Sequence, residues 1–262
     1  MNKIVTKKFK INRKKQKALF EEFLKVYKKR PIKNNKGGMD LINLFNLFIV
    51  IKILKPKLIV ESGVYKGLSS WFILKAAQKN TKIFCLDINL SQLQYRSSKI
   101  YYLEKDFKNL NFYNMPKKTL LVLDDHQNHL LRLKQSVLFG FSHIFLDDDS
   151  DAFNHDFYTL KHAIKKRKFN HKLKLNSIIK TTFIFFDLIF RKLLGKFNSY
   201  EKLNSRLRDT GFDIADHSFL KKYVEKIFYF DENINFFRNY YKRSFSDPRK
   251  NGSFQTLIKL KK

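Results

Sequence analysis

The sequence is poor in the features that would make it a secreted or membrane-spanning protein. It has a single cysteine, Cys85, in 262 residues, so no internal disulfide can form, and this usage fits a reducing compartment. No run approaches the roughly 18 to 20 apolar residues that cross a bilayer, because polar residues interrupt the most apolar stretches, 41–54 and 177–190. The first residues lack the short apolar segment of a secretory signal. We therefore expect a cytoplasmic protein without a transmembrane segment.

Acidic residues are also scarce, since 23 Asp and Glu stand against 54 Lys and Arg, for a net charge of +31. Such an excess is typical of proteins that bind RNA, a phosphorylated glycan or an anionic membrane surface. Here lysine far outnumbers arginine, and the basic runs are spread over 7–17, 25–36, 161–174 and 259–262. The sequence has no zinc-finger spacing and no RNA-recognition signature. We interpret the charge mainly as a compositional bias and keep nucleic acid and peripheral membrane contact as less favoured alternatives.

The order of apolar segments predicts an α/β fold. The expected strands before residue 150 are apolar on both faces and are separated by helices. This pattern is typical of a parallel sheet that is covered on both sides. Two later strands predict an antiparallel pair at one sheet edge. The expected strands are 57–62, 82–88, 99–104, 118–124, 142–147, 226–230 and 254–260, with helices at 68–79 and 127–139.

Four regions follow from this pattern. Residues 1–56 form a basic helical extension, in which a first helix ends at Pro31 and the apolar helix 40–54 packs beside the sheet. Residues 57–150 form the first half of the core. Residues 151–225 are expected to be a mainly helical insertion that covers the substrate, and 226–262 close the same core. The helix 40–54 is also a candidate contact for a homo-oligomer.

The segment Lys57-Leu-Ile-Val-Glu-Ser-Gly-Val-Tyr-Lys-Gly67 combines a strand, a tight turn and a helix start. This arrangement is typical of nucleotide-binding crevices in α/β proteins. Gly63 is expected to adopt backbone angles closed to other residues, and a side chain at Gly67 would obstruct a close ligand. Glu61, at the strand end, is placed to accept hydrogen bonds from a ribose or an amino group.

Almost every expected strand ends in a carboxylate, and in open α/β sheets ligands bind outside the carboxyl ends of the strands. Asp87 follows Gly67 by about twenty residues, the usual distance to an acid that holds ribose hydroxyls. Asp106 is a candidate acceptor for an adenine amine, with Phe107 available to stack. The alternative for Asp87 and for Asp106 is a purely structural role, such as capping a helix.

In these residues the chain resembles the class I S-adenosylmethionine-dependent methyltransferases. The resemblance covers roughly 57–150 and 226–262, and it implies a Rossmann-like, seven-stranded, mostly parallel sheet with helices on both faces and an antiparallel C-terminal strand pair. It makes 57–150 the cofactor-binding half. Tyr65 stands where a middle glycine is common, and this variant looks like the macrocin-type O-methyltransferases and cephalosporin-hydroxylase-like proteins. Tyr65 then lines the cofactor site.

Members of that subgroup that depend on a metal carry an acid after the fourth strand and a pair of acids, or an acid and an amide, after the fifth. The resemblance therefore implies a Mg²⁺ site, because adjacent strand ends bring several oxygen ligands together. Asp124 and Asp125 compete for one position, since a shift of one residue reverses the face. The other candidate ligands are Asp147 and Asp148, and the candidate catalytic residues are Asp124, His126 and His129. Alternatively, His129 pairs with neighbouring acids and the acids are structural.

The resemblance implies S-adenosylmethionine as cofactor and O-methylation of a sugar or another small hydroxylated metabolite, the acceptor being a small molecule or a glycan. A second hypothesis is a metal-dependent nucleotide-sugar glycosyltransferase, because Asp147-Asp-Asp149 matches an Asp-x-Asp motif. A third is a non-catalytic, polyanion-binding protein on a methyltransferase-like scaffold.

Overall fold

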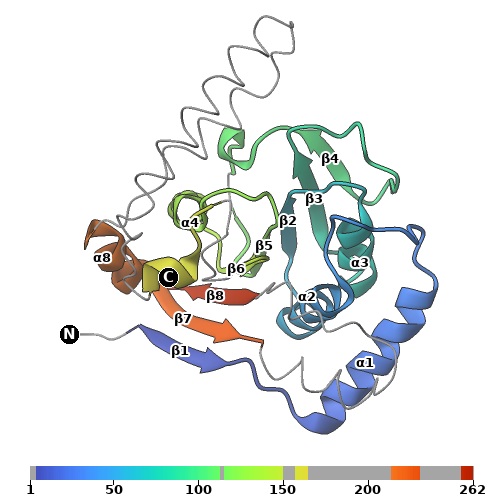
Figure 1. Cartoon of the computed structure of the whole chain (residues 1–262), viewed down its shortest axis with the longest axis horizontal. Helices are drawn as coiled ribbons and strands as arrows, with labels where there is room; N and C mark the ends of the chain where they lie inside the picture. Colours follow the sequence, from blue (N-terminus) through green and yellow to red (C-terminus); the bar gives the residue numbers. More distant parts are fainter. Residues whose placement is uncertain (1–3, 113–114, 150–156, 165–213, 231–254, 262) are drawn as a thin grey trace, which may run out of the picture.

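The computed structural model describes residues 4–112, 115–149, 157–164, 214–230 and 255–261. These residues form an eight-stranded mixed sheet with helices on both faces (Figure 1). The strand order is β1-β7-β8-β6-β5-β2-β3-β4, and every neighbouring pair is parallel except the two that involve β8. The strands are β1 (Val5–Lys8), β2 (Leu58–Ser62), β3 (Lys82–Asp87), β4 (Tyr101–Glu104), β5 (Thr119–Leu123), β6 (His143–Leu146), β7 (Val224–Tyr229) and β8 (Thr256–Leu260).

The strand order of β2 to β8 confirms the predicted Rossmann-like fold with an antiparallel C-terminal strand. The chain winds from β2 through β3 to β4, and then returns to the other side of β2 for β5 and β6. This reversal creates a topological switch point between β2 and β5. Ligands of open α/β sheets bind at such a point, outside the carboxyl ends of the strands.

The strand β1 is an addition to the predicted seven strands, since the sequence predicted only helices in the extension 1–56. Val5 pairs with Lys226 of β7, so the N-terminal segment extends the sheet edge. β1 is only four residues long and all of them are exposed. Its sequence therefore lacks the alternation of apolar and polar residues that predicts a half-buried strand. The predicted first helix, α1 (Arg13–Lys28), begins only after this strand and is capped by Asn12.

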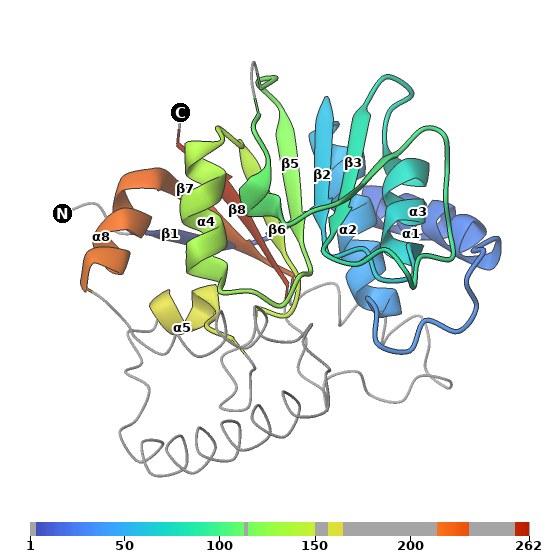
Figure 2. The same cartoon turned by 90° about the horizontal axis from the view of Figure 1, so that it is seen from above.

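The helices divide into two sets, one on each face of the sheet (Figures 1 and 2). The first set packs in one buried apolar cluster and the second set in another. The first set is α1, α2 (Leu41–Leu54) and α3 (Leu68–Ala76); the second is α4 (His129–Leu138), α5 (Leu160–Ile164) and α8 (Ile214–Tyr223).

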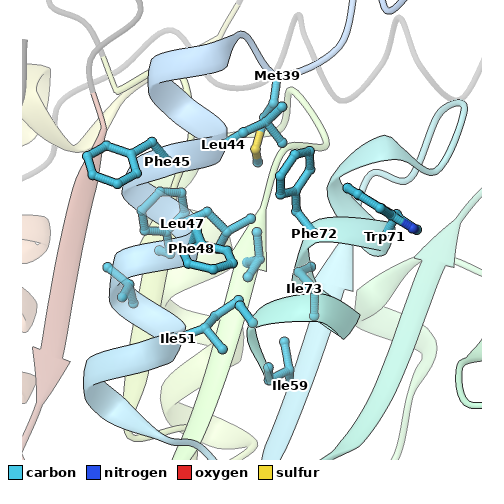
Figure 3. Close-up of a cluster of buried hydrophobic side chains, with 14 of the residues drawn as sticks. Met39, Leu44, Phe45, Leu47, Phe48, Ile51, Ile59, Trp71, Phe72 and Ile73 are labelled. Atoms are coloured by element: carbon cyan, nitrogen blue, oxygen red, sulfur yellow. The ribbon is translucent and has the colours of Figure 1, made fainter. Parts of the chain in front are cut away.

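Aromatic contacts join the N-terminal extension to the core. Phe23 of α1 is fully buried, and its ring centroid lies 5.2 Å from those of Phe45 and Phe72. Figure 3 shows Phe45 on α2 and Phe72 on α3 within one cluster of buried side chains. The apolar residues 44, 45 and 47–51 of α2 are all buried inside the chain. This helix is therefore already covered, and a homo-oligomer stays a prediction.

Among the described residues, no helix is both long and apolar enough to span a membrane. The predicted insertion 151–225 is described only at 157–164 and 214–225, and residues 165–213 lie outside the described residues. The four regional boundaries stay a prediction.

Replacing Phe23 by alanine tests whether the N-terminal extension is part of the core. We expect Phe23→Ala to lower the free energy of unfolding by about 3–5 kcal/mol, because the substitution leaves a cavity among buried rings. Leu138→Ala is the matched control, since Leu138 is 83% exposed. Urea unfolding followed by circular dichroism measures both, and equal effects of the two substitutions would contradict this account.

Candidate functional site

The glycine turn lies at the carboxyl end of β2, against the end of β5. Gly63 has a φ of 93°, which a side chain disfavours. A Cβ atom there would also collide with the Asp124 carbonyl oxygen. Gly67, with a φ of 90°, caps α3, and a Cβ atom there would lie 2.8 Å from Leu93 Cδ1 and 3.0 Å from the Tyr95 carbonyl oxygen. Packing of the chain itself therefore disfavours a side chain at either glycine. The role of Gly63 and Gly67 beside a ligand stays a prediction.

Asp87, at the end of β3, holds this turn in place. Its Oδ2 accepts hydrogen bonds from the backbone N–H groups of Val64 (2.9 Å) and Tyr65 (3.1 Å). Its Oδ1 accepts a hydrogen bond from the backbone N–H of Asn89 at 3.2 Å. The next residue, Ile88, is 52% exposed beside this acid and was not singled out from the sequence. The ribose-binding role of Asp87 stays a prediction.

Tyr65 and Lys66 connect the turn to the N-terminal extension. Tyr65 has a left-handed φ of 51°, and its hydroxyl donates a hydrogen bond to the Lys36 carbonyl oxygen at 3.2 Å. The Lys66 ammonium donates to the carbonyl oxygen of Asn34 at 3.2 Å. The segment before α2 is thereby tied to the turn. The role of Tyr65 in lining a cofactor site stays a prediction.

Glu61 is fully buried on the α3 side of the sheet. Ser70 donates a hydrogen bond to its Oε2, whereas Oε1 has no hydrogen-bond partner among the described residues. Burial raises the pKa of the Glu61 carboxyl, and contacts with Ser69, Ser70 and Cys85 offset this rise only in part. A direct hydrogen bond from Glu61 to a ribose or an amino group stays a prediction.

Asp106 follows β4 and is occupied by protein contacts. Its Oδ1 accepts hydrogen bonds from the Lys108 backbone N–H and from Arg132 Nη1, each at 2.8 Å. It thereby caps a short 3₁₀ helix, η1 (Phe107–Asn109), as the structural alternative proposes. Its role as an adenine acceptor stays a prediction.

The expectation that Phe107 stacks on adenine is wrong. Phe107 is fully buried, and its ring packs against those of Phe112, Phe139 and Phe141 at centroid distances of 5.2 to 6.1 Å. A cluster of aromatic residues beside α4 covers the face that a base would need.

Alternation along β5 separates the roles of Asp124 and Asp125. Val122 packs in the apolar cluster of α2 and α3, whereas Leu123 packs in the cluster of α4. Continued alternation places Asp124 on the α2 side and Asp125 on the α4 side. The contacts agree, because Asp125 Oδ2 accepts a hydrogen bond from Ser62 Oγ at 2.7 Å and lies 2.9 Å from Arg132 Nε.

Asp124, His126 and Asp148 form the candidate cation site. One ligand atom from each lies within 4.8 Å of the others. His126 and Asp148 have left-handed φ angles of 51° and 53°. Burial, together with the charges of Asp147 and Asp148, raises the pKa of Asp124 well above its usual value. Two carboxylates and an imidazole fit a divalent cation, because each offers a donor that such ions accept.

Asp147, a predicted ligand, is outside this group of three. It is buried, and its Oδ1 accepts hydrogen bonds from Asn43 Nδ2 (2.9 Å) and Gln255 Nε2 (2.5 Å). Burial and the charge of Asp148 raise its pKa well above the usual value. Asp147 is therefore anchored to α2 and to Gln255, the residue before β8. Its role as a ligand, like that of Asp125, stays a prediction.

His129, a predicted catalytic residue, lies inside the protein. It is 4% exposed, and its Nδ1 lies 3.4 Å from Asp149 Oδ1 and 3.4 Å from the Leu160 backbone N–H nitrogen. Burial would raise the pKa of Asp149, but His129 and Thr256 lower it below its usual value. The structure thus brings His126 to Asp124 and Asp148, whereas His129 pairs with Asp149, as the alternative for His129 proposes. A catalytic role of His129 stays a prediction.

Comparison with known proteins gives structural likenesses only. No family model matches the chain, and no curated protein matches its sequence. The Mg–SAM form of CmcI is 23% identical, with a TM-score of 0.38, over 45% of this chain and 58% of that chain. The SAH-bound methyltransferase PaMTH1 of Podospora anserina is 13% identical, with a TM-score of 0.44, over 94% of this chain and 88% of that chain.

The O-methyltransferase TomG of Streptomyces achromogenes, in complex with SAM, is 9% identical with a TM-score of 0.33, over 53% of this chain and 66% of that chain. The present chain spans less than two thirds of the length of CmcI. At these TM-scores, the likenesses assign neither a family nor an activity.

Two glycine substitutions test the close approach of β2 and β5. Gly140 also has a positive φ, of 78°, but a Cβ atom there would meet nothing within 4 Å. We expect Gly140→Ala to cost about 1–2 kcal/mol of unfolding free energy, the price of the left-handed backbone alone. Gly63→Ala adds a collision with a backbone carbonyl and should cost clearly more. Equal losses of stability in urea unfolding would show that the collision is relieved.

The buried Glu61 predicts a pH dependence of stability. The pKa of Glu61 is raised in the folded protein, so the protonated carboxyl contributes in full to the free energy of unfolding below its pKa in the unfolded chain, near 4.5. This contribution is lost as the pH rises through the pKa of Glu61 in the folded protein. The unfolding free energy of Glu61→Gln, minus that of the wild type, should therefore increase with pH above 4.5.

Glu225→Gln is the control for this pH series. A hydrogen bond from Lys259 lowers the pKa of Glu225, so the same difference for Glu225→Gln should fall as the pH rises to about 4.5 and stay constant at higher pH. Chemical unfolding at several pH values measures both differences. A difference for Glu61→Gln that stays constant with pH would contradict the raised pKa.

Proposed function

We propose that the protein is an S-adenosylmethionine-dependent methyltransferase that methylates a hydroxyl group of a sugar or another small hydroxylated metabolite, with help from a divalent cation. One observation carries the proposal. The turn 63–67, Asp87 and the group Asp124, His126 and Asp148 all lie at the carboxyl edge of the sheet, beside its topological switch point.

The cofactor half of the proposal depends on Asp87 and its surroundings. Hydrogen bonds from Val64 and Tyr65 fix the Asp87 carboxylate against the turn, and a carboxylate has further lone pairs for ribose hydroxyls. Ile88 offers an exposed apolar side chain next to this acid, as a wall for an aromatic base requires. Gly67 starts α3, whose N-terminal end faces the same edge and favours electron-rich groups.

The transfer half depends on Asp124, His126 and Asp148. When bound, S-adenosylmethionine supplies an electrophilic methyl group and a divalent cation favours the ionised form of a nearby hydroxyl. The carboxylates of Asp124 and Asp148 would hold the cation, and Asp147 would keep Asp148 in place through its contacts with Asn43 and Gln255. His126 is exposed at this edge, where it would serve as a third ligand or accept the proton of the acceptor.

The glycosyltransferase hypothesis has weaker support. In the Asp147-Asp-Asp149 motif, the outer acids are both buried and engaged with protein groups, Asp147 with Asn43 and Gln255 and Asp149 with His129 and Thr256. The glycine turn would also have no role on that hypothesis. The polyanion-binding hypothesis rests on charge alone, and the cytoplasmic location rests on the sequence.

Calorimetric titration of S-adenosylhomocysteine, with and without Mg²⁺, tests the proposal. We expect binding to the wild type and a weakening of about tenfold or more in Asp87→Asn, because hydrogen bonds to a charged acceptor are lost. Asp124→Asn should keep cofactor binding but lose the binding of Mn²⁺. Glu225→Gln is the control, since Glu225 pairs with Lys259 at the amino edge of the parallel strands.

Absence of binding to folded wild-type protein in both conditions would refute the methyltransferase proposal. In that case, thermal-shift measurements with UDP- and GDP-sugars plus Mn²⁺ would decide whether the glycosyltransferase hypothesis replaces it.

A further inference from the structure

Arg132, on the first turns of α4, joins two acids that come from different strand ends. It is 3% exposed. Its Nη1 donates hydrogen bonds to Asp106 Oδ1 (2.8 Å) and Gln135 Oε1 (2.9 Å), and its Nη2 donates to Asp106 Oδ2 (3.2 Å). Its Nε lies 2.9 Å from Asp125 Oδ2 in an ion pair, without the angle of a hydrogen bond. One guanidinium thus engages two carboxylates.

These contacts connect parts of the sheet that are not neighbours. Asp106 follows β4 and Asp125 follows β5, while β2 and β3 lie between those strands. Ser62, at the end of β2, donates its own hydrogen bond to Asp125. The ends of β2, β4 and β5 are therefore tied together on the α4 side of the switch point.

The arrangement is sensitive to loss of the guanidinium. A buried charge is costly unless it is paired, and removal of one partner leaves the others unpaired. Burial would raise the pKa of Asp106, but its hydrogen bonds with Arg132 lower the pKa below the usual value. A lysine would keep the charge but lacks the planar fork that engages both acids at once.

Asp125 lies between two residues of the candidate cation site, Asp124 and His126. The left-handed φ of His126, 51°, costs a residue with a side chain about 1–2 kcal/mol, so neighbouring contacts must maintain it. Asp125 supplies such contacts, because it is held by Ser62 and Arg132 and accepts a hydrogen bond from the Gln127 backbone N–H at 3.3 Å.

We propose that Arg132 is a positioning residue for the cation site. By holding Asp125 on the α4 side, it keeps Asp124 turned to the opposite side and His126 in its left-handed conformation. Arg132 touches none of the three candidate ligands and acts through Asp125. Its importance for catalysis rests on the proposed function, whereas its effect on cation binding can be measured independently.

Binding of Mn²⁺ to the full-length protein, followed by electron paramagnetic resonance, tests this role. We expect Arg132→Gln to weaken Mn²⁺ binding by about tenfold or more, as loss of a group that orients metal ligands typically does. Arg132→Lys should fall between this variant and the wild type. Lys259→Gln is the matched control, because Lys259 pairs with Glu225 at the opposite edge of the sheet.

Folded Arg132→Gln that binds Mn²⁺ as tightly as the wild type would overturn the inference and leave Arg132 a purely structural residue. If that variant does not fold, Arg132→Gln combined with Asp125→Asn replaces it, since no unpaired carboxylate then remains at Asp125. The same weakening is expected, and unchanged binding again overturns the inference.

The outcomes separate this inference from the proposed function. Wild-type protein that binds S-adenosylhomocysteine but no Mn²⁺ overturns the role of Arg132 and leaves the cofactor assignment intact. Wild-type protein that binds Mn²⁺ but no S-adenosylhomocysteine overturns the methyltransferase proposal, while the comparison of the Arg132 variants still decides the positioning role.

Discussion

The close approach of Gly63 to the Asp124 carbonyl group is the constraint on which the candidate site depends. Because Gly63 has no side chain, the chain leaving β2 can lie directly against the chain leaving β5. The turn and the acids after β5 consequently share one edge of the sheet. Asp87 then fixes the turn from the neighbouring strand. The turn that we propose for the cofactor and the acids that we propose for the cation thus lie side by side.

Within that frame, the acids at the strand ends divide into two groups. Most are satisfied by protein partners, namely Asp106, Asp125, Asp147 and Asp149, which contact Arg132, Asn43, Gln255, His129 and Thr256. Asp124 and Asp148 instead point towards His126. The acids with protein partners restrict the loops that follow the strands, and these loops in turn position Asp124 and Asp148. A row of carboxylates in the sequence does not separate acids that have protein partners from acids that lie beside His126.

Much of the architecture could be predicted from the sequence because it depends on local patterns. Seven strands, the glycine turn and the position of Asp124 at the end of a strand all follow from apolar runs and from the residues that end them. The supporting contacts could not be predicted, because they join residues far apart in the chain, such as Asn43 or Gln255 with Asp147. Arg132 gave no signal among 54 basic residues. Phe107 was misinterpreted because its burial depends on three other rings.

The position of β8 has a consequence for how the chain matures during synthesis. β8 lies between β6 and β7, so among the described strands β1 and β7 join the rest of the sheet only through β8. The strands β2 to β6 can pair with one another much earlier. Until β8 is made, β6 presents an unpaired strand edge, and such an edge is a template for pairing with another chain. The strands that carry the candidate site can thus pair before β8 is made, and β8 then joins β7 and β1 to them.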